Sequence, residues 1–321
     1  MLGFRGPSLP GWIREFEARF GLGGVILFDY DVPTRTRGRN VESPEQVAAL
    51  CAEVHALPSR PLVFVDQEGG QVRRLKEALG FAPLPSARQF AQLGLAERRR
   101  LAEASFSEQR ALGIDFDLAP VIDADTNPDN PNIGKIERAF SDDLDVIENN
   151  ARLLGDAARS CGLQLCVKHY PGLGGAIVDS HADLTELDGR FDAAQEALFA
   201  ELAMALPGRA ALLSHGIVRE WDPDWPVSIS AVAIERLRRA APELLLVSDD
   251  MQMEGLRKRA SLEQACVRAI AGGLDLICLG NNLRYEEDAA TRCAEQIAAH
   301  VDPETVREAR ERVAQRKRDA A

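Results

Sequence analysis

The feature that most constrains this chain is a series of short apolar runs, each of which ends at a polar residue. Five such runs occupy residues 62–65, 165–167, 212–213, 244–247 and 276–279. Continuous apolar runs of this length are typical of parallel strands that are buried on both faces. Residues 24–28 and 114–120 bring the number of predicted strands to seven, and the sequence offers no clear eighth strand.

Segments with helical patterns lie between the predicted strands. Ser43 is expected to cap a helix that begins at Pro44, with Gln46 completing a capping box. A second helix is expected over residues 261–270, where the apolar side chains share one face and Gly272 follows as a stop signal. The alternation of strand and helix indicates an α/β protein with a parallel sheet.

The polar residues at the strand ends help to distinguish an open, doubly wound sheet from a closed barrel. An open sheet gathers its ligand at one switch point, whereas here almost every predicted strand ends in a polar residue. No G-x-G-x-x-G or Walker-type loop follows the first strand. We therefore predict a (β/α)8 TIM-type barrel in which one strand is irregular or missing. Residues 1–321 are expected to form a single domain, with residues 302–321 as a C-terminal helix.

The charge balance and the cysteines limit the partners and the setting. The chain has 38 Lys and Arg residues against 50 Asp and Glu residues, a net charge of −12 that argues against a nucleic-acid partner. No apolar stretch reaches 18 residues and no signal-peptide pattern begins the chain, so we expect no membrane span. The six cysteines include no C-x-x-C pair, which favours a reduced, cytoplasmic setting.

Residues 168–181 are the stretch that most clearly suggests chemistry. Lys168 and His169 leave a buried strand and enter a loop rich in Gly and Pro. Asp179 and His181 are spaced so that the carboxylate can orient the imidazole as a proton donor and acceptor near neutral pH. The alternative is that Asp179 only caps a turn and His181 faces solvent.

Two other strand ends carry carboxylates. Asp249 is expected to emerge rigidly at the rim of the barrel, as a nucleophile or a metal ligand, unless it only caps the next helix. Asp66 precedes two glycines and Arg74, and the alternative there is a solvated turn with a surface ion pair. The five histidines lack the close spacing of zinc ligands, so we expect no metal, although Mg²⁺ needs only one or two carboxylates.

Together these motifs resemble glycoside hydrolase family 3, and within it the single-domain bacterial β-N-acetylglucosaminidases of cell-wall recycling. The resemblance rests on residues 23–28, 66–70, 119–123, 137–140, 168–181 and 248–255, in the family's order. It implies that Asp249 attacks the anomeric carbon and forms a covalent glycosyl-enzyme, with net retention. It also implies that His181, assisted by Asp179, protonates the leaving oxygen, and that the sugar hydroxyls are held by Asp66, Arg74, Arg138, Lys168 and His169.

The chain departs from the family pattern in the loop that carries His181. The family commonly reads Lys-His-Phe-Pro-Gly-His-Gly-Asp, whereas here Leu173 replaces the second histidine and Gly175 the aspartate. Tyr170 for Phe is a milder change. The changes at Leu173 and Gly175 each remove a polar side chain from the loop.

We therefore expect a retaining exo-β-glycosidase that acts on a glycan or muropeptide with a terminal N-acetylglucosamine and needs no cofactor. One alternative is a catalytically impaired, sugar-binding paralogue whose loop no longer positions His181. Others are a family member that acts on another β-sugar or one that uses phosphate as the acceptor. The oligomeric state is left open.

Overall fold

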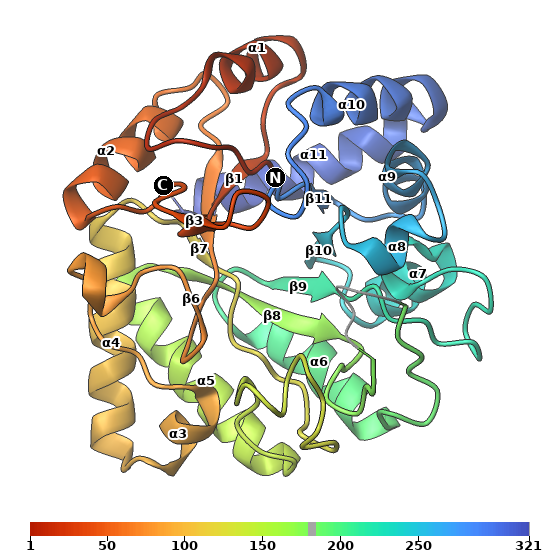
Figure 1. The fold of residues 1–321 in the computed structure, drawn as a ribbon. Coiled ribbons are helices and arrows are strands. Elements are labelled where there is room, and N and C mark those ends of the chain that lie inside the picture. The colour runs from red at the N-terminus through yellow and green to blue at the C-terminus, as the bar shows by residue number, and fades with distance from the viewer. Residues whose placement is uncertain (179–183, 321) are drawn as a thin grey trace.

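The computed structural model describes residues 1–178 and 184–320, and its strands lie inside a layer of helices (Figure 1). In this part of the chain seven strands form one parallel sheet. Their order is β1 (Gly24–Leu27), β4 (Leu62–Val65), β7 (Phe116–Asp117), β8 (Gln164–Tyr170), β9 (Ala210–Leu213), β10 (Leu245–Asp250) and β11 (Leu276–Cys278). Two antiparallel hairpins pair β2 (Tyr30–Asp31) with β3 (Thr36–Arg37) and β5 (Gln67–Gly69) with β6 (Val72–Arg73).

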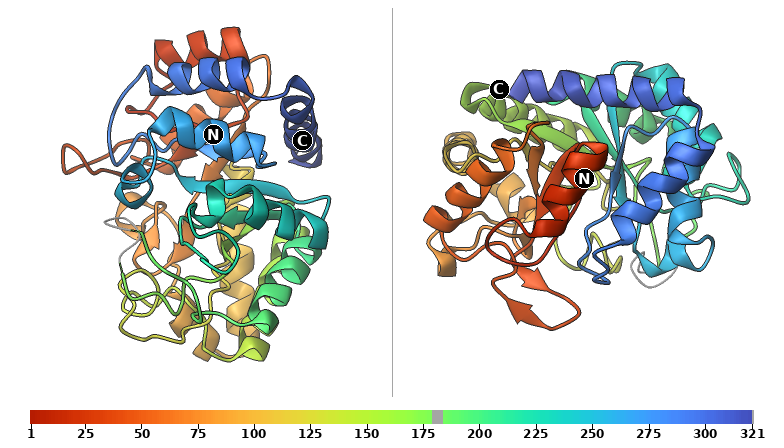
Figure 2. Two further views of the ribbon diagram at one scale, coloured as in Figure 1. Left: turned by 90° about the vertical axis from the view of Figure 1, so that its right-hand side faces the viewer. Right: turned by 90° about the horizontal axis from the view of Figure 1, so that it is seen from above.

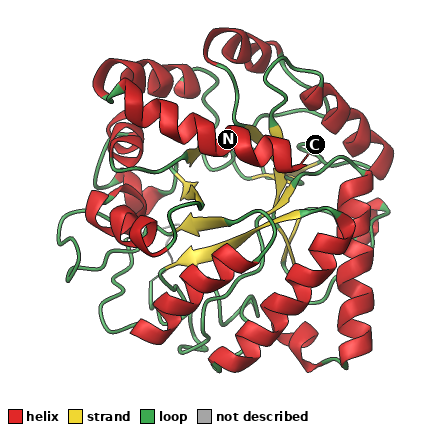
Figure 3. Cartoon of the chain, turned by 180° about the vertical axis from the view of Figure 1, so that it is seen from behind, coloured by secondary structure: helices red, strands yellow, loops and turns green. Residues whose placement is uncertain are grey.

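Helices surround the sheet on its outer side (Figure 3). They are α1 (Gly11–Phe20), α2 (Pro44–His55), α3 (Ala87–Gln92), α4 (Leu95–Ala111), α5 (Leu144–Cys161), α6 (Ala193–Ala205), α7 (Ala231–Ala240), α8 (Glu254–Arg257), α9 (Leu262–Ala271), α10 (Ala289–His300) and α11 (Pro303–Ala320). Two short 3-10 helices cover Glu77–Leu79 and Val227–Ile229. None of the helices in the described ranges is both long and apolar enough to cross a bilayer.

Residues 1–3 close the sheet into a ring. The Leu2 N–H donates to Gly24 O at 3.0 Å, and the Gly3 N–H donates to Leu279 O at 2.8 Å. Leu2 thus forms parallel bridges with Val25 of β1 and with Leu279, the residue that follows β11. The predicted barrel is confirmed, and this short segment occupies the position for which the sequence offered no strand.

Apolar side chains fill both the interior of the ring and the space between the ring and its helices. Phe64 and Phe116 stack inside the ring with their centroids 4.9 Å apart. A larger cluster of buried side chains packs between the strands and the helices. Because side chains alternate along a strand, Asp117 of β7 points away from Phe116 and toward the helix layer.

The caps of α2 and α9 agree with the predictions from the sequence except for one hydrogen bond. The Ser43 Oγ accepts the Gln46 N–H at 3.3 Å and so caps α2. The Gln46 side chain, however, accepts from the Glu42 N–H, so the capping box expected at Ser43 does not form. A capping box does form at Ser261, where α9 begins.

The two ends of the ring are covered differently. The β2–β3 hairpin projects from the body of the molecule (Figure 2). At the opposite end α11 runs past the starts of several strands: Gln164 Nε2 donates to Arg316 O, and Lys317 Nζ donates to Leu22 O. α11 therefore covers part of the amino end of the ring.

Candidate active site

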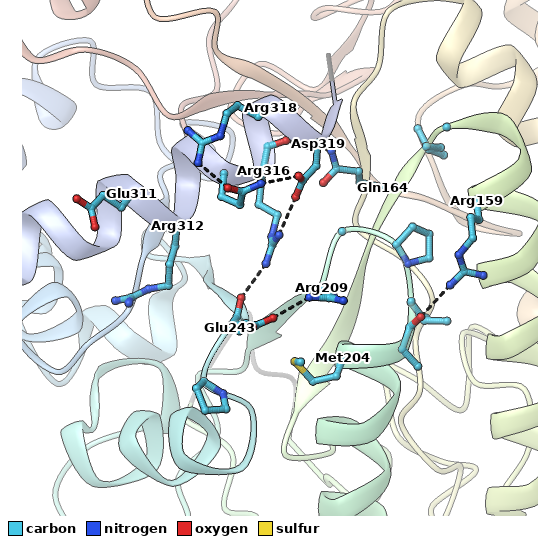
Figure 4. A pocket seen from close by; sticks show the side chains of 18 of the residues that line it. Arg159, Gln164, Met204, Arg209, Glu243, Glu311, Arg312, Arg316, Arg318 and Asp319 are labelled. Atoms are coloured by element: carbon cyan, nitrogen blue, oxygen red, sulfur yellow. Dashed lines mark hydrogen bonds and ion pairs between the residues drawn. The ribbon is translucent and has the colours of Figure 1, made fainter.

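Two cavities lie at opposite ends of the ring. One of about 450 Å³ lies at the carboxyl ends of β1, β4, β8 and β10. The other, of about 1200 Å³, lies at the starts of β8, β9 and β10 beside α11 (Figure 4). Barrel enzymes build their active sites at the carboxyl ends of the strands, which favours the first cavity.

The charges around the amino-terminal cavity are paired with one another. Arg209 Nη1 lies 2.7 Å from Glu243 Oε2, and Arg316 Nη1 lies 2.8 Å from Asp319 Oδ2 (Figure 4). The side chains of Arg209 and Glu243 are 50% and 66% exposed. Water screens the exposed pair of Arg209 and Glu243, as it screens ion pairs on an ordinary charged surface.

At the carboxyl-terminal cavity, by contrast, a lysine is buried between two carboxylates. Lys168 Nζ lies 2.7 Å from Asp66 Oδ1 and 2.5 Å from Glu68 Oε1. The side chains of Lys168 and Glu68 are each 3% exposed. Burial of an ammonium group is costly unless it is paired, and here two anions provide the pairing.

Two arginines extend this cluster. Arg138 Nε and Nη2 both donate to Glu68, at 2.7 and 2.8 Å, in a bidentate pair. Arg74 Nη2 donates to Asp66 Oδ2 at 2.9 Å, and its guanidinium lies 5.3 Å from the centre of the Phe28 ring. The result is a fixed wall of alternating charge in which Asp66 and the three cations line the cavity and Glu68 lies behind them.

The pairing decides the ionisation of the buried carboxyls. Burial alone would raise the pKa of Asp66, but Lys168 and Arg74 outweigh it and hold the pKa well below its usual range. Burial opposes ionisation of Glu68 as well, yet the charges of Arg138 and Lys168 lower its pKa to about 2. Both groups are therefore anions at neutral pH.

His169 is held as a neutral ring by its two neighbours. An arginine can only donate, so the Arg138 Nη2 contact of 3.1 Å makes His169 Nε2 an acceptor. The proton of the ring is then on Nδ1, which donates to Asp123 Oδ2 at 2.7 Å. Asp123 also accepts the backbone N–H of Leu173 at 2.8 Å, so one carboxylate orients both the imidazole and the start of the loop.

Bulges in two strands orient His169 and Asp249. The register of β8 against β9 shifts between Lys168 and Tyr170, and that of β10 against β11 shifts between Val247 and Asp250. An extra residue of this kind redirects a side chain at the end of a strand. At the second bulge the Ser248 Oγ accepts the Cys278 N–H at 2.9 Å, which replaces a ladder hydrogen bond.

Asp249 lines the same cavity as the charged wall. Its Oδ1 accepts the Asp250 N–H at 2.8 Å, and the residue is only partly buried. Interior side chains of the ring close the cavity from below, and apolar side chains form the remaining wall. The lining includes Ile26, Leu118, Leu212, Tyr30, Val32, Met253 and Leu283.

The first part of the loop after β8 is tightly packed. Asn130 Nδ2 donates to Leu173 O at 2.6 Å, and Asn127 Nδ2 donates to Ala176 O at 2.9 Å. A Cβ on Gly175 would lie 2.4 Å from Arg190 O, so the aspartate of the family pattern does not fit this backbone. Leu173 is buried at the edge of the cavity.

Six residues predicted from sequence thus border one cavity: Asp66, Arg74, Arg138, Lys168, His169 and Asp249. Asp179 and His181 lie outside the described residues. The sequence reasoning did not assign Glu68 or Asp123, although each belongs to a quoted motif, and their position beside a strand end was the available signal. Over residues 1–178 and 184–320, no group of three or more His, Cys, Asp and Glu side chains is placed to hold a metal ion.

Comparisons with known proteins agree with this geometry. The family model of the glycosyl hydrolase family 3 N-terminal domain matches residues 13–316. A beta-hexosaminidase from Thiobacillus denitrificans is 32% identical over 306 residues, which covers 91% of this chain and 79% of that protein. A beta-hexosaminidase from Nitrosomonas eutropha is 31% identical over 312 residues, which covers 93% and 85%.

Solved structures show the same architecture. The β-N-acetylhexosaminidase from Beutenbergia cavernae superposes with a TM-score of 0.83 at 25% identity, covering 100% of this chain and 95% of that one. A family 3 β-N-acetylglucosaminidase from a Paenibacillus species gives a TM-score of 0.86 at 26% identity, covering 100% of this chain and 61% of that one. The chain belongs to glycoside hydrolase family 3 and is a glycoside hydrolase.

Proposed function

We propose that this enzyme is a retaining, exo-acting β-N-acetylhexosaminidase that releases a terminal N-acetylglucosamine. The observation that carries the proposal is that Asp249 and the wall of paired charges border one cavity. Its volume of about 450 Å³ and its floor of interior side chains suit a sugar that enters end first. The relatives named beta-hexosaminidase support the sugar class.

In the proposed reaction, the Asp249 carboxylate attacks C1 of the sugar and forms a covalent glycosyl-aspartate as the bond from C1 to the leaving oxygen breaks. Water then attacks C1, the bond to Asp249 breaks, and the configuration is retained overall. The bulge at the end of β10 supports this role, because it holds the side chain on a rigid strand rather than on a loop.

We assign the acid and base role to His181 assisted by Asp179, an assignment that rests on the family resemblance. Among the described residues, His169 is the histidine that borders the cavity, and its hydrogen bonds argue against this role for it. Its Nε2 already accepts from Arg138 and its Nδ1 proton is engaged by Asp123. A ring in this state has no free proton to give to a leaving oxygen.

The charged wall is proposed to bind the sugar hydroxyls. Asp66, Arg74, Arg138, Lys168 and His169 offer both donors and acceptors at the cavity surface. Hydrogen bonds to charged groups contribute about 1.5–3 kcal/mol each, which suits recognition of a small polar ligand. Because the groups already hold one another in place, little ordering is needed when the sugar binds.

The decisive experiment asks which carboxylate becomes glycosylated. A 5-fluoro-N-acetylglucosaminyl fluoride should label Asp249, and Asp249→Ala should lower kcat for p-nitrophenyl N-acetyl-β-glucosaminide by about 10⁴-fold or more. Azide should rescue that variant and yield a glycosyl azide of inverted configuration. A label on Asp250 or on Asp66 would overturn the assignment of the nucleophile.

A panel of p-nitrophenyl β-glycosides of N-acetylglucosamine, glucose and xylose tests the sugar. N-acetylglucosamine should give the highest kcat/KM, and a preference for glucose or xylose would contradict the proposed specificity. Running the panel in phosphate and in a non-phosphate buffer identifies the acceptor. Because of the family resemblance, we extend the proposal to cell-wall recycling in the cytoplasm. Release of N-acetylglucosamine from purified muropeptides would test the substrate, and fractionation of cells would test the compartment.

A further inference from the structure

A buried carboxyl group supports the charged wall from behind. Asp117 of β7 is fully buried, and its Oδ1 accepts the backbone N–H of Gln67 at 3.0 Å. Gln67 is the residue between Asp66 and Glu68, the two carboxylates that pair with Lys168. Asp117 therefore holds the segment that carries both site carboxylates without itself lining the cavity.

The contact extends to Arg74 through the side chain of Gln67. The Gln67 Oε1 accepts the backbone N–H groups of Arg74 and Leu75, each at 3.0 Å, and its Nε2 donates to Leu75 O. One hydrogen bond to Asp117 thus anchors a residue that organises two of the chain segments of the wall, residues 66–68 and Arg74. A third, small cavity of about 30 Å³ borders Asp117, Glu68 and Arg138 together.

The surroundings of Asp117 provide no cation in direct contact among the described residues. From α4, Gln109 Nε2 donates to Asp117 Oδ2 at 3.0 Å and also to Ser105 Oγ at 3.3 Å. Lys168 attracts the carboxylate from a distance, and Asp66 repels it. Burial is the largest influence and raises the pKa of Asp117 to about 7.

The neighbouring amide can adapt to either state of this carboxyl. The Gln109 Oε1 is buried and has no hydrogen-bond partner among residues 1–178 and 184–320. When Asp117 is an anion, it accepts from the amide Nε2 as observed. When Asp117 carries a proton, rotation of the amide by half a turn presents Oε1 as the acceptor.

We propose that Asp117 is a positioning residue whose proton content sets how firmly the Asp66–Glu68 segment is held, so that sugar affinity depends on pH through a group that does not touch the sugar. The inference rests on the sugar-binding role proposed for Asp66. Above neutral pH the anion accepts a charge-assisted hydrogen bond from Gln67, which is about twice as strong as a neutral one. Below neutral pH this support weakens.

The chain contains a matched control two residues away. Asp115 is equally buried and accepts the Val63 N–H at 2.8 Å, near the amino end of the same strand pair. Its carboxylate contacts His55 and Arg110 instead of a glutamine. Asp115 therefore shares the burial of Asp117 and lies directly before the same strand, but it does not lie behind the site.

The test measures the inhibition constant of N-acetylglucosamine from pH 5.5 to 8.5 for the wild type, Asp117→Asn and Asp115→Asn. Asparagine mimics the protonated acid, so the Asp117→Asn constant should equal the wild-type one at pH 5.5. At pH 8.5 it should exceed the wild-type constant about fivefold. At each pH the Asp117→Asn constant is divided by the wild-type constant, and contributions from other titrating groups cancel in this ratio.

A ratio that stays constant across the pH range, or one that Asp115→Asn reproduces, overturns the proposal. If Asp117→Asn does not fold, Gln109→Met provides the test. Loss of the amide donor should move the midpoint of the pH dependence of the inhibition constant to higher pH, and an unchanged midpoint would contradict the proposal.

Asp66→Ala distinguishes failure of the sugar-binding role of Asp66 from failure of the positioning role of Asp117. If it leaves the inhibition constant unchanged, the sugar-binding role itself fails; if it weakens binding while Asp117→Asn matches the wild type, only the inference fails.

Discussion

Ion pairs lie at both ends of the barrel, and the pairs of Arg209 with Glu243 and of Lys168 with Glu68 differ greatly in how much of each side chain is exposed to solvent. At the amino end Arg209 and Glu243 pair at 2.7 Å with half or more of each side chain exposed. At the carboxyl end Lys168 and Glu68 pair with 3% of each side chain exposed. Solvent can replace either partner of the first pair, whereas the second is shielded from water and its members pair with other charged groups of the protein, Asp66 and Arg138. The number of ion pairs therefore says little about function, and their burial says much more.

The largest effect should follow from removing the buried cation. Lys168→Met leaves Asp66 and Glu68 as neighbouring anions away from water, and should cost about 3–5 kcal/mol of unfolding free energy together with most of kcat/KM. Urea unfolding and steady-state kinetics measure the two quantities.

The same substitution at the other end provides the control. Lys317 donates to the carbonyl oxygens of Leu22 and Ser59 rather than to carboxylates. Lys317→Met should therefore destabilise the protein less and leave kcat/KM unchanged. Equal losses of unfolding free energy and of kcat/KM for Lys168→Met and Lys317→Met would show that the two ends of the barrel do not differ in this respect.

Acid should weaken the carboxyl end through Glu68. The pairing lowers the pKa of Glu68 from 4.5 to about 2, so its contribution is complete above about pH 4.5 and is lost as the pH falls through about 2. This difference corresponds to about 3 kcal/mol. The unfolding free energies of the wild type and Glu68→Gln, measured from pH 2 to 6, should converge toward the acid end; parallel curves would contradict the pairing.

Arg138→Lys should have an intermediate effect. Lysine keeps the charge but cannot make the bidentate contact with Glu68 while also donating to His169. We expect a loss of about 1.5–3 kcal/mol in transition-state stabilisation, measured as kcat/KM. Arg209→Lys is the comparison at the amino end, and a loss of similar size there would count against a special role for Arg138.

The smallest effect should come from Glu243→Gln. This change removes an exposed pair and should alter the unfolding free energy by less than about 1 kcal/mol, with kcat/KM unaffected. Thermal unfolding and the same kinetic assay check it. A large loss of activity would indicate that the amino-terminal cavity communicates with the site.

The sequence predicted the parts of the molecule that depend on local order. Asp66, Lys168 and Asp249 were identified because each closely follows an apolar run, and parallel strands bring such positions to one edge. The alternation of Ile114, Asp115, Phe116, Asp117 and Leu118 also indicated a strand. It did not indicate that both aspartates are fully buried, because their partners lie on other elements, as Gln109 on α4 shows.

The remaining features depend on contacts between distant residues. Glu68 and Arg138 are 70 positions apart, and neither local pattern contains information about the other. The bulges that orient His169 and Asp249 arise from register between neighbouring strands. The closing segment at residues 1–3 is too short to show a periodicity, and only its hydrogen bonds to both neighbouring strands identify it.

That closing segment has a consequence for how the protein is made on the ribosome. Leu2 is synthesised before every strand of the sheet, yet one of its two bridge partners, Leu279, follows the last strand, β11. Until then the growing sheet has two unpaired margins, which are sites where chains can pair wrongly with one another. Substitutions that weaken these few hydrogen bonds should therefore reduce the yield of folded protein in cells more than they reduce the specific activity of the molecules that fold.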